Sequence, residues 1–234
     1  MRKLGLIGGM SWLSTRTYYD EINRLVQRKL GKHASAPMAI ESLDYRGLNN
    51  LQSDEDWARA AQHVVEAAKR LEASGAERIL ITANVMHKVY DEIADAIDTP
   101  ILHIADCTAN RMEADKVGKA LILGMRSAVT EGYLRDRIEQ RGIELLPMNA
   151  SDIEEVHRLI VEELKLGKSS RSGERTLKTI ITIGEQAGAK AVILACTELE
   201  MVVDVDANVL PIYDTARIHC QVAADWAMAG EQVS

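Results

Sequence analysis

The sequence has no long hydrophobic run and no excess of positive charge, and each absence excludes a class of protein. No stretch of its 234 residues approaches the ~18 consecutive apolar residues that a membrane-spanning helix needs. The formal net charge is −7, from 28 basic and 35 acidic residues, whereas a nucleic-acid surface needs clustered Lys and Arg. We therefore expect neither a membrane nor a nucleic acid as a partner.

Cysteine is scarce and scattered. Cys107, Cys196 and Cys220 show neither CxxC spacing nor a Cys/His metal pattern. An odd and sparse set suits free thiols in a reducing compartment better than a disulfide framework. Residues 1–9 hold only a brief apolar run before paired glycines, which predicts a first strand and turn and not a signal peptide. These features predict a cytoplasmic protein without a bound metal.

Short apolar runs alternate with longer helical patterns along the whole chain, which is 47% hydrophobic and can bury a sizeable core. The predicted strands span residues 4–8, 38–43, 78–82, 101–104, 119–123, 144–148, 191–195 and 209–212. The predicted helices, with apolar residues at helical spacing, include residues 14–30, 55–74, 152–166 and 176–187. This alternation predicts an α/β fold with mostly parallel sheets and right-handed crossovers.

Two short matches indicate an internal duplication. Residues 6–10 resemble 122–125, and residues 78–83 resemble 191–196, at nearly the same separation along the chain. The sequence therefore predicts two similar three-layer α/β halves. Their expected bounds are 1–99 with a returning segment 211–234, and 100–210. Parallel sheets bind ligands beyond the carboxyl ends of their strands, so we expect the active site in a cleft between the halves.

Cys196 directly follows a buried-looking strand, and a helix start follows it. A thiol at such a junction meets free backbone N–H groups and the positive end of a helix dipole, which lower its pKa. Such a thiolate could remove a proton and return it. The alternative is a small apolar filler, since free cysteine is often buried. The position alone does not decide between the two interpretations.

Two further turns carry polar groups after predicted strands. Gly8 and Gly9 precede Ser11 at a helix start, where exposed N–H groups can hold a carboxylate or phosphate. The spacing is not GxGxxG, which disfavours a dinucleotide, and a tight strand-to-helix connection is the simpler alternative. Asn84 and His87 occupy the corresponding turn after residues 78–82, where they could contact a ligand or serve as a helix cap and a structural donor.

Taken together, these segments resemble the aspartate/glutamate racemase superfamily nearly from end to end. The blocks that carry the resemblance are Gly8-Gly9-Met10-Ser11-Trp12-Leu13-Ser14-Thr15, residues 84–89 (Asn-Val-Met-His-Lys-Val), residues 102–106 (Leu-His-Ile-Ala-Asp), Cys196-Thr197-Glu198 and residues 214–219 (Asp-Thr-Ala-Arg-Ile-His). The resemblance implies an enzyme, an isomerase that exchanges the α-proton of an amino acid between two residues on opposite faces. It also implies that neither pyridoxal phosphate nor a metal takes part, and that homodimers form.

The resemblance implies Cys196 as one acid/base and places the other at Ala83, whose methyl group cannot transfer a proton. Relatives usually carry cysteine or threonine there. Thr82, next to Ala83, retains a hydroxyl and is the candidate replacement, although no activating partner is evident. Val85 and Ala128 stand where many relatives have hydroxyls that hold the substrate carboxylate.

The same resemblance gives a set of expected substrate contacts. Arg46 and Lys165 align with basic residues that grip the side-chain carboxylate in some relatives. The complete expected set is Met10, Ser11, Arg46, Ala83, Asn84, Val85, Ser127, Lys165, Thr197 and Glu198.

Three functions are consistent with these residues. The first is a racemase for aspartate, glutamate or a related amino acid. The second is a single-cysteine reaction on the same scaffold, such as decarboxylation of a malonate-like acid, isomerisation, or hydrolysis. The third is a binder of an acidic amino acid that has lost turnover. Ala83 weighs against the first, because losing a positioned general base typically costs ~10²–10⁴-fold in rate.

Overall fold

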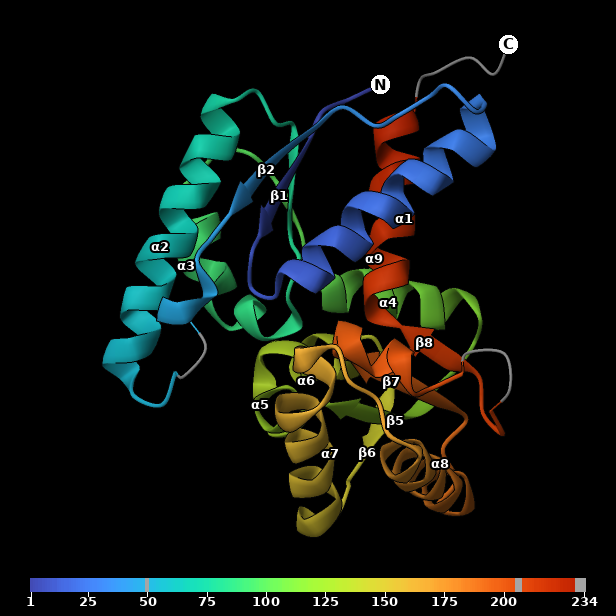
Figure 1. The fold of residues 1–234 in the computed structure, drawn as a ribbon. Coiled ribbons are helices and arrows are strands. Elements are labelled where there is room, and N and C mark those ends of the chain that lie inside the picture. Colours follow the sequence, from blue (N-terminus) through green and yellow to red (C-terminus); the bar gives the residue numbers. More distant parts are fainter. Residues whose placement is uncertain (49–50, 205–207, 230–234) are drawn as a thin grey trace. The chain divides into compact units, whose positions relative to one another are not determined.

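The computed structural model describes residues 1–48, 51–204 and 208–229, and the chain divides into two compact units (Figure 1). One unit holds Met1–His103 and the segment that begins at His219, and the other is Ile104–Ile218. The sequence predicted that the chain returns from the second unit to the first at residues 210/211. In the structure the chain returns later, between Ile218 and His219, because the strand at Ile212–Asp214 pairs within the second unit's sheet.

The first unit is built on a four-stranded parallel sheet with the order β2-β1-β3-β4. Its elements are β1 (Leu4–Gly8), α1 (Trp12–Leu30), β2 (Met38–Ser42), the 3-10 helix η1 (Tyr45–Gly47), α2 (Asp54–Ala73), β3 (Arg78–Ile81), the 3-10 helix η2 (Asn84–Val89), α3 (Tyr90–Ala94) and β4 (Ile101–Leu102). Pairing of Ile7 with Ile81 brings the carboxyl ends of the two central strands together.

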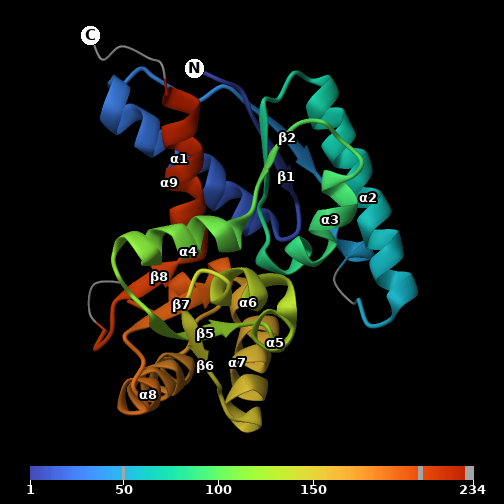
Figure 2. The ribbon, with the colours of Figure 1, turned by 180° about the vertical axis from the view of Figure 1, so that it is seen from behind.

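Helices cover both faces of this sheet because its strands are apolar on both sides. Ile7, Ile79 and Ile81 lie in one buried cluster with apolar residues of α2 and α3. Successive strand residues point to opposite faces, so the buried Leu6 and Leu80 face the other side. Figures 1 and 2 show α1 and the last helix α9 (Thr215–Met228) on that side, and α2 with α3 on the opposite one.

The second unit repeats this plan with the strand order β6-β5-β7-β8, again all parallel. Its elements are α4 (Ile104–Ala114), β5 (Lys119–Gly124), α5 (Arg126–Thr130), α6 (Gly132–Glu139), β6 (Glu144–Leu146), α7 (Ala150–Glu162), the 3-10 helix η3 (Leu164–Leu166), α8 (Arg171–Gln186), β7 (Ala191–Ala195), the 3-10 helix η4 (Thr197–Met201) and β8 (Ile212–Asp214).

The two faces of the second sheet bury different helices. Leu121 and Leu123 of β5 lie in a cluster with residues of α7 and α8. The alternating residues Ala120 and Ile122 lie in a cluster with α4 and α6. Figure 2 shows α4 on one side of this sheet and α7 with α8 on the other. The predicted fold class is therefore confirmed: each half is a three-layer α/β unit with a parallel sheet.

The predicted elements differ from the observed ones mainly at their ends. β1 and β7 have the predicted bounds, whereas the strand expected at 209–212 forms at Ile212–Asp214. The helix expected at 152–166 begins earlier, because the Asn149 side chain accepts a hydrogen bond from the Asp152 N–H at 2.8 Å. It ends at Glu162, since Glu163 has a φ of −120° and leaves the helical conformation. No helix in the three described ranges is long and apolar enough to cross a membrane.

Candidate active site

The turn after β1 places a buried hydroxyl at the start of α1. Gly9 has a φ of 87°, and a Cβ there would lie 2.1 Å from the Leu43 carbonyl oxygen, so only glycine fits. Ser11 is the N-cap residue of α1, yet its side chain makes no capping hydrogen bond. Its Oγ is buried without a partner among the described residues. A hydroxyl and the N–H groups of a long helix therefore meet where an anion could bind. Met10 beside them is buried in the apolar cluster of the first unit.

Thr82 has a structural role in this unit. Its side chain is fully buried, and its hydroxyl donates a hydrogen bond to the Ile7 carbonyl oxygen at 3.1 Å. The same hydroxyl lies 3.2 Å from Thr15 Oγ1, which in turn accepts from the Gly9 N–H at 2.9 Å. These bonds join the ends of β1 and β3 to the first turn of α1. The geometry therefore gives no support to Thr82 as the replacement acid/base.

Ala83 ends the extended backbone of β3 and precedes the 3-10 helix η2. It has φ −144° and ψ 123°, and its methyl group packs in the same apolar cluster as Met10. Asn84 is buried and Val85 is half-buried. The ends of β1 and β3 thus bring Met10, Ser11, Ala83 and Asn84 to one edge of the first sheet.

His87, His103 and His219 form a buried cluster that contacts this turn through the Ala83 carbonyl oxygen. His87 Nδ1 is 3.1 Å from the Ala83 carbonyl oxygen, and because a carbonyl only accepts, Nδ1 carries the proton. The His87 ring is 4.6 Å from the His103 ring and 6.1 Å from the His219 ring, measured between centroids. The sequence identified His87 as a possible structural donor, but nothing in its spacing predicted the cluster.

His219 is held as a neutral ring. Its Nε2 lies 3.1 Å from the Leu102 carbonyl oxygen, so it is the protonated nitrogen, and Nδ1 accepts from the Tyr18 hydroxyl at 2.9 Å. Burial, and next the charge of His87, lower the pKa of His219 to about 3. The ring is therefore a structural link between α1, α9 and the end of β4.

In the second unit, Cys196 occupies the position that Ala83 has in the first. It follows β7 in an extended conformation, with φ −156° and ψ 126°, and precedes the 3-10 helix η4. The thiol is buried and donates a hydrogen bond to Glu198 Oε2 at 3.1 Å. Glu198 and Thr197 are themselves buried.

The expectation of a lowered pKa at Cys196 is wrong. Burial is the largest cause that raises the pKa of the thiol, and the negative charge of Glu198 adds to it. Lys165 acts in the opposite direction without reversing the effect. The helix that follows has only five residues and is a 3-10 helix, so it offers little dipole to stabilise a thiolate. Cys196 is therefore a protonated thiol at neutral pH.

Three other residues of the second unit lie near this thiol or its turn. Lys165, half-buried in η3, is close enough to influence the pKa of Cys196. Ser127, in the short helix α5 that follows β5, has its Oγ 3.3 Å from the Tyr133 hydroxyl. Burial is the main cause that raises the pKa of Tyr133, and the charge of Cys196 also raises it. Tyr133 was missed by sequence reasoning, because a single tyrosine outside the recognised sequence blocks carries no signal of its own.

Comparisons with known proteins identify the family of the chain. The sequence profile of the Asp/Glu/Hydantoin racemase family matches residues 7–223. The chain belongs to this family. The crystal structure of a candidate Asp/Glu racemase from Yersinia pestis is 40% identical, with a TM-score of 0.91, and the match covers 97% of this chain and 100% of that one.

Two further relatives resemble this racemase-family protein. An aspartate racemase homologue from Pyrococcus horikoshii OT3 is 30% identical with a TM-score of 0.85, and the match covers 97% of this chain and 99% of that one. The broad specificity amino-acid racemase RacX of Bacillus subtilis (strain 168) is 23% identical over 216 residues, 91% of this chain and 92% of that protein.

Arg46, one of the expected substrate contacts of this racemase-family protein, already has a charged partner. The Arg46 side chain is 91% exposed and pairs with Asp44 at 2.5 Å. Hydrogen bonds from Arg46 lower the pKa of the Asp44 carboxyl to about 2, which keeps the pair charged. Arg46 is therefore occupied by its neighbour, and its part in binding stays a prediction.

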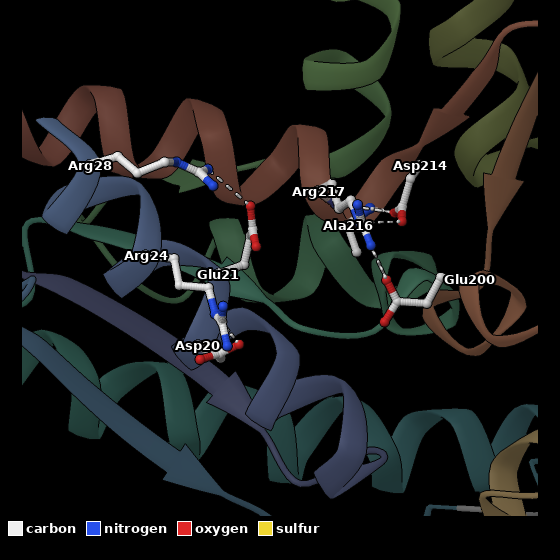
Figure 3. Close-up of polar contacts among 8 residues, drawn as sticks. All are labelled: Asp20, Glu21, Arg24, Arg28, Glu200, Asp214, Ala216 and Arg217. Carbon is white, nitrogen blue, oxygen red and sulfur yellow. Dashed lines mark hydrogen bonds and ion pairs between the residues drawn. The ribbon is translucent and has the colours of Figure 1, made fainter. Parts of the chain in front are cut away.

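The end of β8 carries the last family block, residues 214–219. Asp214 Oδ1 accepts hydrogen bonds from the N–H groups of Ala216 at 2.9 Å and Arg217 at 3.1 Å, and so caps α9 (Figure 3). The Arg217 guanidinium lies between Asp214 and Glu200, with N–O distances of 3.4 and 3.3 Å. Burial raises the pKa of Asp214 to about 6.

No group of three His, Cys, Asp or Glu side chains in the described part of the chain could hold a metal ion.

Proposed function

We propose that this protein is a cofactor-independent amino-acid racemase in which the Cys196 thiol carries the α-proton. The observation that carries the proposal is the buried thiol at the end of β7, hydrogen-bonded to Glu198 Oε2 at 3.1 Å. A thiol needs a base to become a thiolate that can remove a proton, and here a carboxylate is already in hydrogen-bond contact with it.

The proton balance of this step is complete with the residues present. Glu198 accepts the thiol proton, and the thiolate then takes the α-proton of the bound amino acid, leaving a carbanion conjugated with the carboxylate. Return of the proton to carbon regenerates the thiolate, which recovers its own proton from Glu198. The raised pKa of Cys196 suits this role, because a weakly acidic thiol gives a more basic thiolate.

The proposed substrates are aspartate, glutamate or a related amino acid. Lys165 supplies a positive charge that Cys196 senses, and it is the basic group we propose for a side-chain carboxylate. In the first unit, we propose that the unpartnered Ser11 hydroxyl at the start of α1 is a group able to bind a carboxylate. Asn84, Ser127 and Thr197 are proposed as further polar contacts.

Ala83 limits the proposed reaction. Racemisation needs a proton carrier on each face of the substrate, and the first unit offers a methyl group at the position equivalent to Cys196. We therefore expect α-proton exchange on one face to be faster than inversion. Inversion then depends on a water that gives a proton to the carbanion on the other face. The hydroxide left behind takes the proton held by Glu198, and the abstracted α-proton stays on Cys196, so the starting protonation state is restored.

The test is proton NMR of the protein in D₂O with L- and D-aspartate and L- and D-glutamate, followed by chiral analysis. Loss of the α-proton signal with the wild type, and its absence with Cys196→Ala, is the expected result. Exchange that persists in Cys196→Ala, or no exchange with any of the four substrates, would overturn the proposal.

A second candidate is favoured by the combination of Ala83 with a protonated Cys196. Decarboxylation of a malonate-like acid releases CO₂ and leaves an enediolate, which needs one proton on one face. The Cys196 thiol could donate that proton and recover it from water through Glu198. CO₂ release from a substituted malonate, together with no exchange of amino-acid α-protons, would favour this function over the first.

A further inference from the structure

Helix α7 holds the start of α5, which follows β5, by two separate contacts with Arg126. His157 Nδ1 accepts a hydrogen bond from the backbone N–H of Arg126 at 3.3 Å. One helical turn earlier, Glu154 pairs with the Arg126 guanidinium, with an Nε–Oε1 distance of 2.5 Å. The backbone and the side chain of residue 126 are therefore both held by α7.

We call the contacts of His157 and Glu154 with Arg126 the clamp. Ser127, the residue that follows Arg126, is one of the proposed substrate contacts. Its Oγ is 3.3 Å from the Tyr133 hydroxyl. Tyr133 is close enough to Cys196 that a thiolate there would raise the pKa of the tyrosine. A displacement of the Arg126 backbone would therefore move the Ser127 hydroxyl relative to Tyr133 and the thiol.

The contact requires an imidazole that is unprotonated at Nδ1, because only a ring nitrogen with a free lone pair accepts an N–H. The charged groups around His157 come from three elements: Arg126 at the start of α5, Glu154 on α7 and Lys165 in η3. Burial is the largest cause that lowers the pKa of His157, the charges of Arg126 and Lys165 add to it, and Glu154 opposes them. The ring is therefore neutral at neutral pH and loses its acceptor in acid.

We propose that His157 is a positioning residue that holds the Arg126–Ser127 turn in its substrate-binding conformation and releases it when the ring is protonated. The effect on the reaction rests on the proposed function, whereas the hydrogen bond itself does not. Because the clamp acts on a binding group and leaves the thiol in place, its loss is expected in KM and much less in kcat.

The kinetic experiment compares three variants in the α-proton exchange assay. His157→Leu removes the acceptor and should raise KM roughly fivefold at neutral pH, the loss expected for one hydrogen bond. His157→Asn places an amide oxygen where Nδ1 was, so it should keep KM near the wild-type value and keep it when the pH falls. His63→Leu, on an exposed histidine of α2, is the matched control.

The pH dependence of KM shows whether His157 acts by positioning Arg126 or only by packing. The KM of the wild type should rise toward that of His157→Leu as the pH falls below the pKa of His157, while His157→Asn stays lower. Asp214, with a pKa of about 6, also titrates in acid, so variants are compared with one another at each pH. Equal KM values for the wild type and His157→Leu across the pH range would overturn the proposal.

A second measurement needs no activity. In amide NMR spectra, the Arg126 N–H resonance should move with the titration of His157 in the wild type, and it should not titrate in His157→Asn. An Arg126 resonance that ignores the His157 titration would overturn the proposal even if the enzyme is active. A protein that exchanges no α-protons but shows the coupled titration would instead overturn the proposed function and support the clamp.

Discussion

The turns after β3 and β7 are built alike and differ in chemistry. Each follows the strand that occupies the third place in its sheet order, and each continues into a 3-10 helix. Ala83 and Cys196 have nearly the same backbone conformation, with φ/ψ of −144°/123° and −156°/126°. One side chain is a methyl group and the other a thiol bonded to Glu198. The backbone of such a turn is therefore set by the strand and helix around it, and the side chain is free to vary.

Burial shifts the pKa values of buried histidines and of buried acidic groups in opposite directions. In the first unit, burial lowers the pKa of His219, so acid works against the fold there. In the second, burial raises the pKa of Cys196 and Asp214, so acid favours their folded form. The four predictions below test the difference between the two turns and the opposite responses to acid, from the largest expected effect to the smallest.

Ala83→Cys should give the first turn the proton carrier that it lacks. A positioned base contributes 10²–10⁴-fold, so we expect inversion of the substrate to accelerate roughly 10³-fold relative to exchange. Chiral analysis of aspartate and glutamate over time checks this. Ala83→Ser has nearly the same size with a much weaker acid/base and is the control. If Ala83→Cys still exchanges the substrate α-proton through Cys196 but inverts the substrate no faster, the two turns are not equivalent.

Acid should weaken the first unit through His219. Its folded pKa of about 3 lies below the unfolded value, so its contribution is complete above about pH 6.5 and is lost as the pH falls toward 3. The loss amounts to roughly 4 kcal/mol across that window. Urea unfolding at several pH values measures it. His219→Gln should show a shallower decline, and an unchanged slope would contradict the assignment.

Asp214→Asn should stabilise the second unit at neutral pH. The folded pKa of about 6 lies above the unfolded value of 3.8, so the stabilising, protonated form is complete only below about pH 4 and is lost as the pH rises through 6. The amide keeps the cap on α9 without the buried charge. We expect about 1–3 kcal/mol of added unfolding free energy at neutral pH. A destabilised Asp214→Asn at that pH would show that the Arg217 ion pair outweighs burial.

Glu198→Gln should make the Cys196 thiol more acidic, because it removes a negative charge that raises the pKa of that thiol. The rate of alkylation by iodoacetamide at neutral pH should rise about tenfold for each unit by which the pKa falls. Mass spectrometry of the Cys196 peptide measures the rate. Glu200→Gln, nearby on η4 and paired with Arg217, is the control. Equal alkylation rates in the wild type and Glu198→Gln would remove Glu198 from the proton path.

Much of the fold could be predicted because its signals are local. The apolar runs at 4–8 and 191–195 are strands with those bounds, and the alternation of strands with amphipathic helices gave the parallel sheets. The strand expected at 209–212 was placed too early, since pairing with β7 selects Ile212–Asp214. Element ends depend on such partners, which a local pattern does not contain.

The candidate site could be predicted in its positions but not in its electrostatics. Cys196 was found as a thiol after a strand and Ala83 as its counterpart, both from order along the chain. The hydrogen bonds of Thr82 could not be predicted, because its partners, Ile7 and Thr15, are more than sixty residues away. Tyr133 and His157 were not identified at all.

The sequence by itself determined the family, the parallel α/β halves, and the presence of a thiol in one turn and a methyl group in the other. Only the tertiary structure decided that the thiol is protonated, that Thr82 is structural, and that histidines from three parts of the chain form one cluster. The physical reason is that periodicity and motifs are properties of neighbours in sequence. Burial, charge and hydrogen-bond partners depend on neighbours in space, and these set the pKa of a group and the chemistry it can perform.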